Sequence, residues 1–398
     1  MSRLKVGIIG SGLAGLSCGY TLAKSGIEFQ IFEASERIGG RVMTYHHPTG
    51  ETVELGAGYF HDHYRIMLSL VQELGLQSQI VPRKYCRVGF IKDGKALALR
   101  EIGIDHPLFI SIANLKHAAT EYCQKINRLL AVYSENNKSF AETISEDPYL
   151  LEAHQTPFIV SELYRSLAPE IQEIFVKPFL RKQLSSEPEN ISLMTATAAL
   201  GASAFNLQSF QGGISLLTET LYTNIKDRVA LNQPITKVHQ DKKQWVLFSS
   251  NQEYVCDVVV SAIPGIALNN LFNYQSSIAY GYTNVFVIEG EKHLHYQGCD
   301  ILFSQEENHK ILGMSRYGER LFKVESFHHQ PDFAEVFQTY KILQQQSWQY
   351  AIPQLPTNKI YPSDVLAENF YLVGDHWLPC MEMAITTGIK AAKKIISS

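Results

Sequence analysis

A glycine motif near the N-terminus constrains the fold of this 398-residue chain more than any other feature. Residues 4–9 and 28–33 are short apolar runs on either side of a segment with helical spacing. Gly10, Gly12 and Gly15 stand where the first run passes into that segment. A strand that enters a helix through such a turn and is followed by another strand starts a dinucleotide-binding βαβ unit. The sequence therefore predicts an α/β fold that begins with such a unit.

Each position of this motif has its own expected role. Gly10 permits the tight turn, Gly12 lets the backbone approach a pyrophosphate, and Gly15 lets the helix pack closely on the strand. Leu13 and Ala14 lie at the start of the helix, where backbone amides can meet phosphate groups. The motif therefore predicts a Rossmann-like domain with a bound dinucleotide.

A carboxylate and a second glycine turn follow the second apolar run. Glu33 stands at the end of this run, where it can accept hydrogen bonds from both ribose hydroxyls of an adenosine and would repel a 2′-phosphate. In the segment from Ala34 to Arg41, Gly40 lets the backbone pass close to a ligand. The planar guanidinium of Arg41 can bind phosphate or ribityl oxygens. A simple NAD-binding fold does not need this second turn.

Together these turns resemble the N-terminus of the flavin amine oxidase superfamily, which includes monoamine and polyamine oxidases, protoporphyrinogen oxidases, phytoene desaturases and, more distantly, renalase. The resemblance implies an FAD-dependent oxidoreductase, and it extends over the whole chain. Three later segments are similar to further family motifs. The flavin-binding residues that they imply are Gly56, Ala57, Gly58 and Tyr59 beside the flavin ring, Ile235 near the adenine, and Gly374, Asp375, Met381 and Ala384 in the closing motif.

The closing motif has a physical role in this interpretation. A backbone amide near Met381 would face the pyrimidine end of the flavin, at the start of a helix. Because reduced flavin is anionic around N1 and O2, amides and a helix dipole there would stabilise the reduced cofactor.

The substrate side of the family pattern is incomplete in this chain. Monoamine and polyamine oxidases carry a lysine near flavin N5 on a strand of the substrate domain, and Asn284 matches that position here. Lys292 falls past the strand, where we expect a solvated surface side chain. Cys380 stands where the family has a tyrosine of its aromatic cage. Cysteines and histidines show no metal-ligand spacing, so we expect no metal.

Candidate catalytic residues are therefore few, and the catalytic group stays unassigned. Trp348 and Tyr350 belong to a segment that resembles protoporphyrinogen oxidases and renalase-like proteins. They could line a flat apolar pocket, or they could be ordinary core aromatics. His61, with His63 nearby, follows the flavin turn and is either a general base or a hydrogen-bonded structural residue.

The chain leaves the dinucleotide-binding domain and returns to it twice in this interpretation. We expect an FAD-binding domain from residues 1–75, 205–265 and 365–398. The remainder, residues 76–204 and 266–364, would form a discontinuous substrate domain of mixed helix and sheet. Within it the patterns predict mostly helix over 107–200, strands over 280–290 and 299–304, and a helix over 332–350.

Composition restricts the partners and the compartment. A net charge of -4 gives no broad positive field, so we expect no nucleic-acid partner. The six cysteines are scattered, which favours reduced thiols in a cytoplasmic protein. No apolar run is long enough to span a membrane. Peripheral membrane contact and the choice between monomer and homodimer stay open.

The expected reaction is hydride transfer from a small organic substrate to flavin N5, with oxygen reoxidising the flavin. The substrate would be amine-like, or porphyrinogen-like or polyene-like. Two alternatives stay open: a renalase-like oxidation of reduced nicotinamides, and a flavin-binding protein without turnover.

Overall fold

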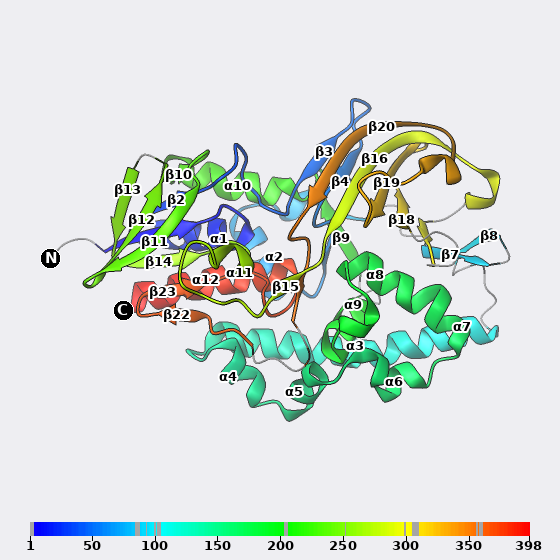
Figure 1. Ribbon diagram of the computed structural model, residues 1–398, viewed down its shortest axis with the longest axis horizontal. Coiled ribbons are helices and arrows are strands. Elements are labelled where there is room, and N and C mark those ends of the chain that lie inside the picture. The colour runs from blue at the N-terminus through cyan, green and yellow to red at the C-terminus, as the bar shows by residue number, and fades with distance from the viewer. Residues whose placement is uncertain are drawn as a thin grey trace.

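In the computed structural model one sheet lies on each side of the molecule, and a layer of helices lies below them (Figure 1). The structure describes residues 4–83, 88–92, 94–98, 101, 105–202, 206–250, 252–297, 300–304, 310–355, 357 and 361–398. Cys86 and Cys299 lie outside these ranges. Among the described helices, none is both long enough and apolar enough to cross a membrane.

A six-stranded sheet carries the glycine motif. Its strands run parallel except for the edge strand β22, which is antiparallel to its neighbour. In spatial order they are β10 (Val229–Ala230), β2 (Glu28–Phe32), β1 (Lys5–Ile9), β14 (Val258–Ser261), β23 (Phe370–Leu372) and β22 (Val365–Ala367). Strands from three distant parts of the sequence therefore meet in one sheet, and the predicted Rossmann-like α/β architecture is confirmed.

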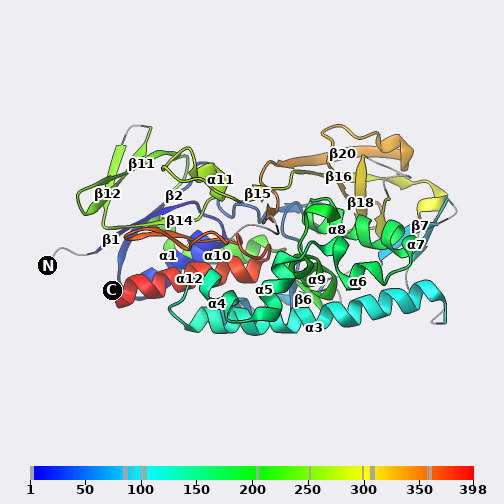
Figure 2. The same cartoon turned by 60° about the horizontal axis from the view of Figure 1, so that its bottom comes forward.

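Different layers cover the two faces of this sheet (Figure 2). On one face lie the helices α1 (Leu13–Lys24), α10 (Ser215–Ile225) and α12 (Met381–Ser397). On the other lies an antiparallel meander of β11 (Ile235–Asp241), β12 (Gln244–Ser249) and β13 (Gln252–Cys256). The central strands β1 and β14 are buried because both faces of the sheet are covered, which explains their unbroken apolar runs in the sequence.

A helical layer fills the middle of the chain, as its periodicity predicts. The longest helix is α3 (Pro107–Glu135), which begins at a His106 cap with proline in its first turn and packs against α9 (Leu193–Ala202). The shorter helices are α4 (Phe140–Ser145), α5 (Pro148–Gln155), α6 (Glu162–Arg165), α7 (Pro169–Ile171) and α8 (Lys177–Leu184). Their buried apolar side chains form one continuous core with α3.

A seven-stranded, mostly antiparallel sheet forms the other side of the molecule. Its spatial order is β20 (Phe337–Trp348), β16 (Thr283–Lys292), β19 (Leu321–Ser326), β18 (Ile311–Arg316), β17 (Asp300–Leu302), β7 (Val88–Lys92) and β8 (Lys95–Ala98). The prediction of a helix over 332–350 is wrong, because most of that segment is the edge strand β20. Its glutamine-rich sequence favours a helix locally, but pairing with β16 along nearly its whole length outweighs that preference.

Two side chains of α12 tie it to neighbouring helices. Glu382 is buried and accepts hydrogen bonds from the amides of Ile66 and Met67, both at 2.8 Å, in the first turn of α2 (Arg65–Glu73). At the other end, Lys390 donates to the carbonyl oxygens of Tyr133 (2.5 Å) and Lys138 (2.7 Å), around the C-terminus of α3. Both contacts provide hydrogen-bond partners for backbone groups at helix ends, which have none within the helix.

Candidate functional site

The glycine motif forms the expected turn between β1 and α1. Gly10 has a φ of +100°, in the region that favours glycine, and its amide donates to the carbonyl of Phe32 at 2.8 Å. A side chain at Gly15 would collide with the carbonyl oxygen of Gly10. The close packing of helix on strand therefore requires glycine at both positions.

Glu33 joins this turn to the second apolar strand. One of its carboxylate oxygens accepts from the amide (2.9 Å) and the hydroxyl (2.8 Å) of Ser11. The other accepts from the amide (3.0 Å) and the hydroxyl (2.9 Å) of Ser35. Four hydrogen bonds thus fix the carboxylate between the two turns.

The two glycine turns lie against each other. A Cβ added at Gly40 would stand 3.2 Å from the Cα of Gly12, and the amide of Gly39 donates to the carbonyl of Ser11 at 2.8 Å. A Cβ added at Gly12 itself would have Gly40 Cα as its nearest atom, at 4.0 Å. The backbone at Gly12 is therefore open on the side where a Cβ would lie.

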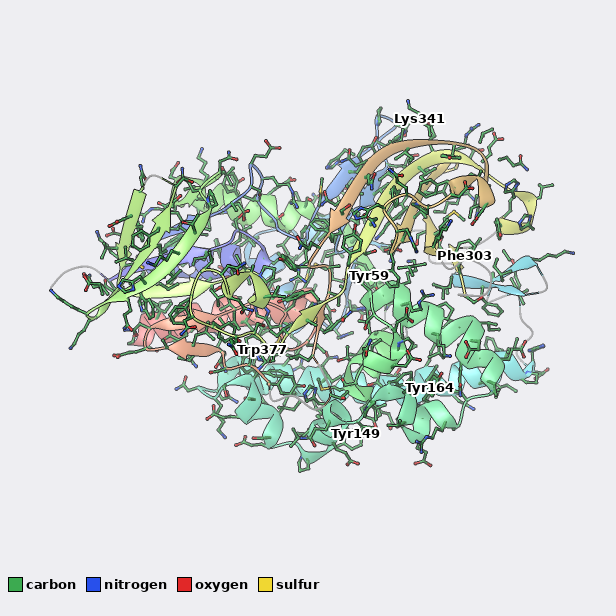
Figure 3. The ribbon with its side chains drawn as sticks, viewed as in Figure 1. Tyr59, Tyr149, Tyr164, Phe303, Lys341 and Trp377 are labelled. Carbon is green, nitrogen blue, oxygen red and sulfur yellow. The ribbon has the colours of Figure 1, made fainter. Side chains whose placement is uncertain are left out.

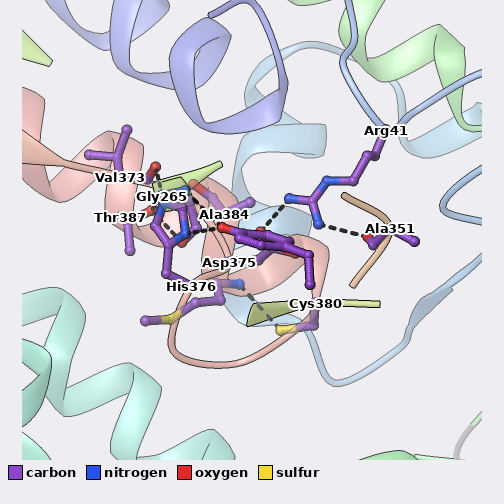
Figure 4. Close-up of polar contacts among 12 residues, drawn as sticks. Arg41, Gly265, Ala351, Val373, Asp375, His376, Cys380, Ala384 and Thr387 are labelled. Atoms are coloured by element: carbon purple, nitrogen blue, oxygen red, sulfur yellow. Dashed lines mark hydrogen bonds and ion pairs between the residues drawn. The ribbon is translucent and has the colours of Figure 1, made fainter. Parts of the chain in front are cut away.

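Arg41 connects the second turn to two distant segments (Figure 4). Its guanidinium forms an ion pair with Asp375 and donates to the carbonyl of Ala351 at 2.9 Å. Burial opposes the charge on Arg41, but Asp375 outweighs this effect and raises the pKa of the guanidinium. The pair holds together segments that lie more than 300 residues apart in the sequence.

The closing motif is fixed by its own hydrogen bonds. The amide of Gly374 donates to the hydroxyl of Thr387 at 2.8 Å. The imidazole of His376 lies 3.1 Å from the carbonyl of Val373 and 3.0 Å from the hydroxyl of Tyr280 (Figure 4). Burial lowers the pKa of His376 to about 4, so the ring is neutral near pH 7.

One cavity of about 580 Å³ joins these segments. Of the residues that the sequence assigns to flavin binding, fifteen line it: Gly10, Gly12, Leu13, Ala14, Glu33, Gly40, Arg41, Gly56, Ala57, Gly58, Tyr59, Gly374, Asp375, Met381 and Ala384. The other three, Gly15, Ala34 and Ile235, do not line the cavity. Gly15 lies behind the turn, and Ile235 belongs to the core beneath the meander.

The aromatic candidates line the same cavity. The indole of Trp348 donates to the carbonyl of Leu55 at 2.6 Å, and the guanidinium of Arg37 lies 5.6 Å from its ring. The ring of Tyr350 packs edge-on against Tyr280, with the ring centres 5.6 Å apart. These contacts place both aromatic side chains on the cavity wall.

His61 and His63 lie stacked on the wall, with ring centres 5.0 Å apart. Burial lowers the pKa of His61 to about 3 and that of His63 to about 4. Both rings are therefore neutral near pH 7. A group with so low a pKa is a weak general base at that pH, which favours a positioning role for His61.

Outside the glycine turns, four charged residues of the wall were missed by the sequence analysis: Arg83, Lys182, Lys323 and Glu325. None belongs to a glycine motif, and no local pattern distinguishes them from surface charges. Asn284, on the neighbouring strand, is fully buried and does not line the cavity, whereas Thr283 and Val285 on either side of it do. Because side chains alternate along a strand, the match to the family's lysine position falls on the opposite face.

Lys292 is also placed differently from the expectation. It is the last residue of β16, and only 8% of it is exposed, with its ammonium 5.3 Å from the ring of Phe322. The strand extends further than its apolar run indicated, so this lysine is packed into the sheet rather than solvated.

Comparisons of the sequence and of the fold both relate this chain to amine oxidases. The family model for flavin containing amine oxidoreductases matches residues 13–297. Over 271 residues the chain is 27% identical to amine oxidase [flavin-containing] A of Sus scrofa, which covers 65% of this chain and 49% of that protein. Over 251 residues it is 28% identical to L-amino acid oxidase of Cerastes cerastes, with 60% and 46% covered. The chain thus spans about half the length of the curated relatives it matches.

Solved structures share the fold over the whole chain. Cyclohexylamine oxidase from Brevibacterium oxydans IH-35A superimposes with a TM-score of 0.74 at 15% identity and covers 99% of both chains. The family match, the glycine turns and the shared fold support one assignment. The chain belongs to the flavin containing amine oxidoreductase family, whose cofactor is FAD.

Proposed function

We propose that this protein uses FAD to oxidise a small organic substrate by hydride transfer, with oxygen reoxidising the flavin. One observation carries the proposal: the flavin-motif residues and residues of the second sheet and the helical layer line a single cavity. A substrate bound beside the cofactor would therefore contact Trp348, Tyr350 and side chains of α3 and α8.

The residues of the cavity fit FAD. The open backbone at Gly12 and the amides of the first turn of α1 provide a place for the pyrophosphate. Glu33, held between Ser11 and Ser35, would bind the adenosine ribose. Gly56 to Tyr59 would lie beside the isoalloxazine ring. Ile235, which the family resemblance assigns to the adenine region, lies outside this cavity.

Bound FAD supplies the hydride acceptor, and this chain supplies orientation and charge stabilisation. The start of α12, at Met381, lies on the cavity wall, where its amides and helix dipole would stabilise negative charge on the cofactor. Burial raises the pKa of the Cys380 thiol to about 12, so the group beside Met381 stays uncharged near pH 7. Near pH 7 the thiol of Cys380 stays protonated and the imidazole of His61 is a weak base, so neither readily accepts a proton from a substrate.

The same arrangement supports a division into two domains. We assign residues 1–75, 205–265 and 365–398 to an FAD-binding domain and the rest to a substrate domain. The six-stranded sheet draws all its strands from the first set, and the seven-stranded sheet draws its strands from the second. Compartment and oligomeric state stay predictions from the sequence.

The first test is the absorbance spectrum of the purified protein, followed by release of the cofactor and its identification. FAD and anaerobic bleaching by a substrate would support the proposal. Candidate substrates are amines, amino acids, porphyrinogens and dihydronicotinamides. A protein that binds FAD but is reduced by none of them would favour a flavin-binding protein without turnover.

A matched pair of variants tests the assignment of the flavin site. Glu33→Ala should lower flavin occupancy, because it removes the acceptor for the ribose and releases both serines. Glu36→Ala, three residues away and exposed, should leave occupancy unchanged. Equal occupancy in both variants would contradict the proposed role of Glu33.

A further inference from the structure

Charged side chains from three separate elements meet on the cavity wall, outside the flavin motifs. Arg83 follows β6 (Ile80–Pro82), Lys182 lies on α8, and Lys323 and Glu325 lie on β19. We call these four residues the cationic corner. Three cations and one carboxylate of this corner line the cavity.

Glu325 holds the two lysines together. The ammonium of Lys182 lies 2.8 Å from one of its carboxylate oxygens, and that of Lys323 lies 2.9 Å from the other. Burial alone would raise the pKa of Glu325, but the two lysines outweigh burial and lower it to about 2. The carboxylate is therefore ionised, and the two ammonium groups exceed it by one charge.

The lysines keep hydrogen-bonding capacity beyond this carboxylate. An ammonium group has three N–H donors. Among the residues that the structure describes, Lys182 contacts Glu325 and the hydroxyl of Ser315 (3.4 Å), and Lys323 contacts Glu325. Their side chains are only 11% and 8% exposed, and a buried cation that lacks acceptors is costly. An anionic ligand in the cavity would supply the missing acceptors.

Two nearby carboxyl groups are bound elsewhere. Glu54 accepts from the amide of Ile214 and the hydroxyl of Thr44, both at 2.8 Å, and Asp300 accepts from the amide of Arg316 at 2.8 Å. Neither lines the cavity. Burial raises their pKa values to about 7 and about 6, and so reduces the negative charge that they carry near neutral pH.

Arg83 and Tyr59 link the corner to the flavin turn. The guanidinium of Arg83 lies 4.9 Å from the ring of Tyr59, whose hydroxyl donates to the side chain of Gln183 at 3.0 Å. Tyr59 lies between the two sides of the molecule (Figure 3). Because Tyr59 belongs to the turn proposed to contact the flavin, a ligand in the corner would lie next to the cofactor.

We propose that the cationic corner binds a carboxylate group of the substrate, through Lys182 and Lys323 with Arg83 beside them. The substrate class is therefore an organic acid, such as an amino acid, rather than a simple amine. A substrate with only an ammonium group would meet three cations and gain no counter-charge beyond Glu325. This inference rests on the proposed function for its reaction, but binding of the carboxylate can be measured without turnover.

Binding is tested first, on the FAD-loaded protein, by the change in flavin absorbance on titration. The probes share a phenyl ring and differ in charge: phenylacetate, benzyl alcohol and 2-phenylethylamine. We expect phenylacetate to bind at least about tenfold more tightly than either of the others, as expected for charge-assisted hydrogen bonds. Equal affinities, or a preference for the amine, would overturn the inference.

Turnover is tested separately with phenylalanine and 2-phenylethylamine, which differ only by the carboxylate. Anaerobic bleaching by the amino acid and not by the amine would support the inference. If neither bleaches the flavin but phenylacetate still binds selectively, the carboxylate site stands and the proposed oxidation of such substrates fails. Efficient bleaching by the amine alone would overturn the carboxylate site.

Variants locate the site. Lys182→Met and Lys323→Met should each raise the dissociation constant of phenylacetate about tenfold or more and leave that of benzyl alcohol unchanged. Lys341→Met is the matched control, because Lys341 is exposed on the outer edge strand of the same sheet (Figure 3). Lys323→Arg keeps the charge and should retain the preference for phenylacetate. A retained preference in this variant would show that substitution at position 323 does not by itself disrupt folding. An unchanged preference in both methionine variants would refute the assignment.

Discussion

The ion pair between Arg41 and Asp375 is the contact whose removal tests the site most directly. In Arg41→Met, the carboxylate of Asp375 would lose its cation while its side chain is only 11% exposed. Removing one partner of a buried ion pair costs about 3–5 kcal/mol. The Arg41 side chain is 33% exposed, so solvent offsets part of this cost, and we expect a loss of about 2–3 kcal/mol in unfolding free energy.

The partner variants complete a double-mutant cycle. Asp375→Asn keeps a hydrogen-bond acceptor and leaves Arg41 its contact with Ala351, so it should cost about 1 kcal/mol. The double variant Arg41→Met/Asp375→Asn leaves no unpaired charge and should be more stable than Arg41→Met alone.

Urea unfolding of the FAD-loaded proteins, followed by tryptophan and flavin fluorescence, measures the unfolding free energies of the wild type, the two single variants and the double variant. Additive losses in the double variant would show that the two charges are not coupled. That result would refute the reasoning.

Three further predictions follow from buried contacts. Glu382→Ala removes the acceptor for two helix amides and should cost about 3 kcal/mol in urea unfolding, whereas exposed Glu219→Ala should cost little. Gly388→Ala would drive a methyl group into the carbonyl of Ala14 where α12 crosses α1, and thermal unfolding should show a loss of about 1–3 kcal/mol. Burial lowers the pKa of His376 to about 4, so the unfolded chain binds a proton below about pH 6.5 that the folded chain does not. Stability should therefore fall by up to about 1.4 kcal/mol per pH unit from pH 6.5 towards 4, and His376→Gln should remove this component of the slope.

The sequence predicts the glycine turns well because these turns depend on backbone geometry. Positions such as Gly10 and Gly15 are fixed by turns and close packing, which tolerate few residue types. Residues that meet across large sequence separations are predicted only where a family motif identifies them. Arg41 and Asp375 were assigned individually, but nothing in the sequence indicates that they form a pair.

The segments outside the six-stranded sheet were predicted less well for a related reason. Strand β20 has a locally helical composition, and only its pairing with β16 makes it a strand. Lys182 and Lys323 lie on a helix and a strand with no distinguishing pattern around them. Their common feature is a contact with Glu325, and that of Lys182 forms only in the folded protein because Lys182 lies on a different element.

The contacts of Lys390 connect two walls of the cavity. Lys390 fastens α12 to the end of α3, and α3 lines the cavity with Cys123, Ile126 and Leu130. The start of α12 lines the same cavity at Met381. Lys390 therefore joins two helices that both line the cavity. Opening the cavity between these two helices would require breaking the hydrogen bonds of Lys390.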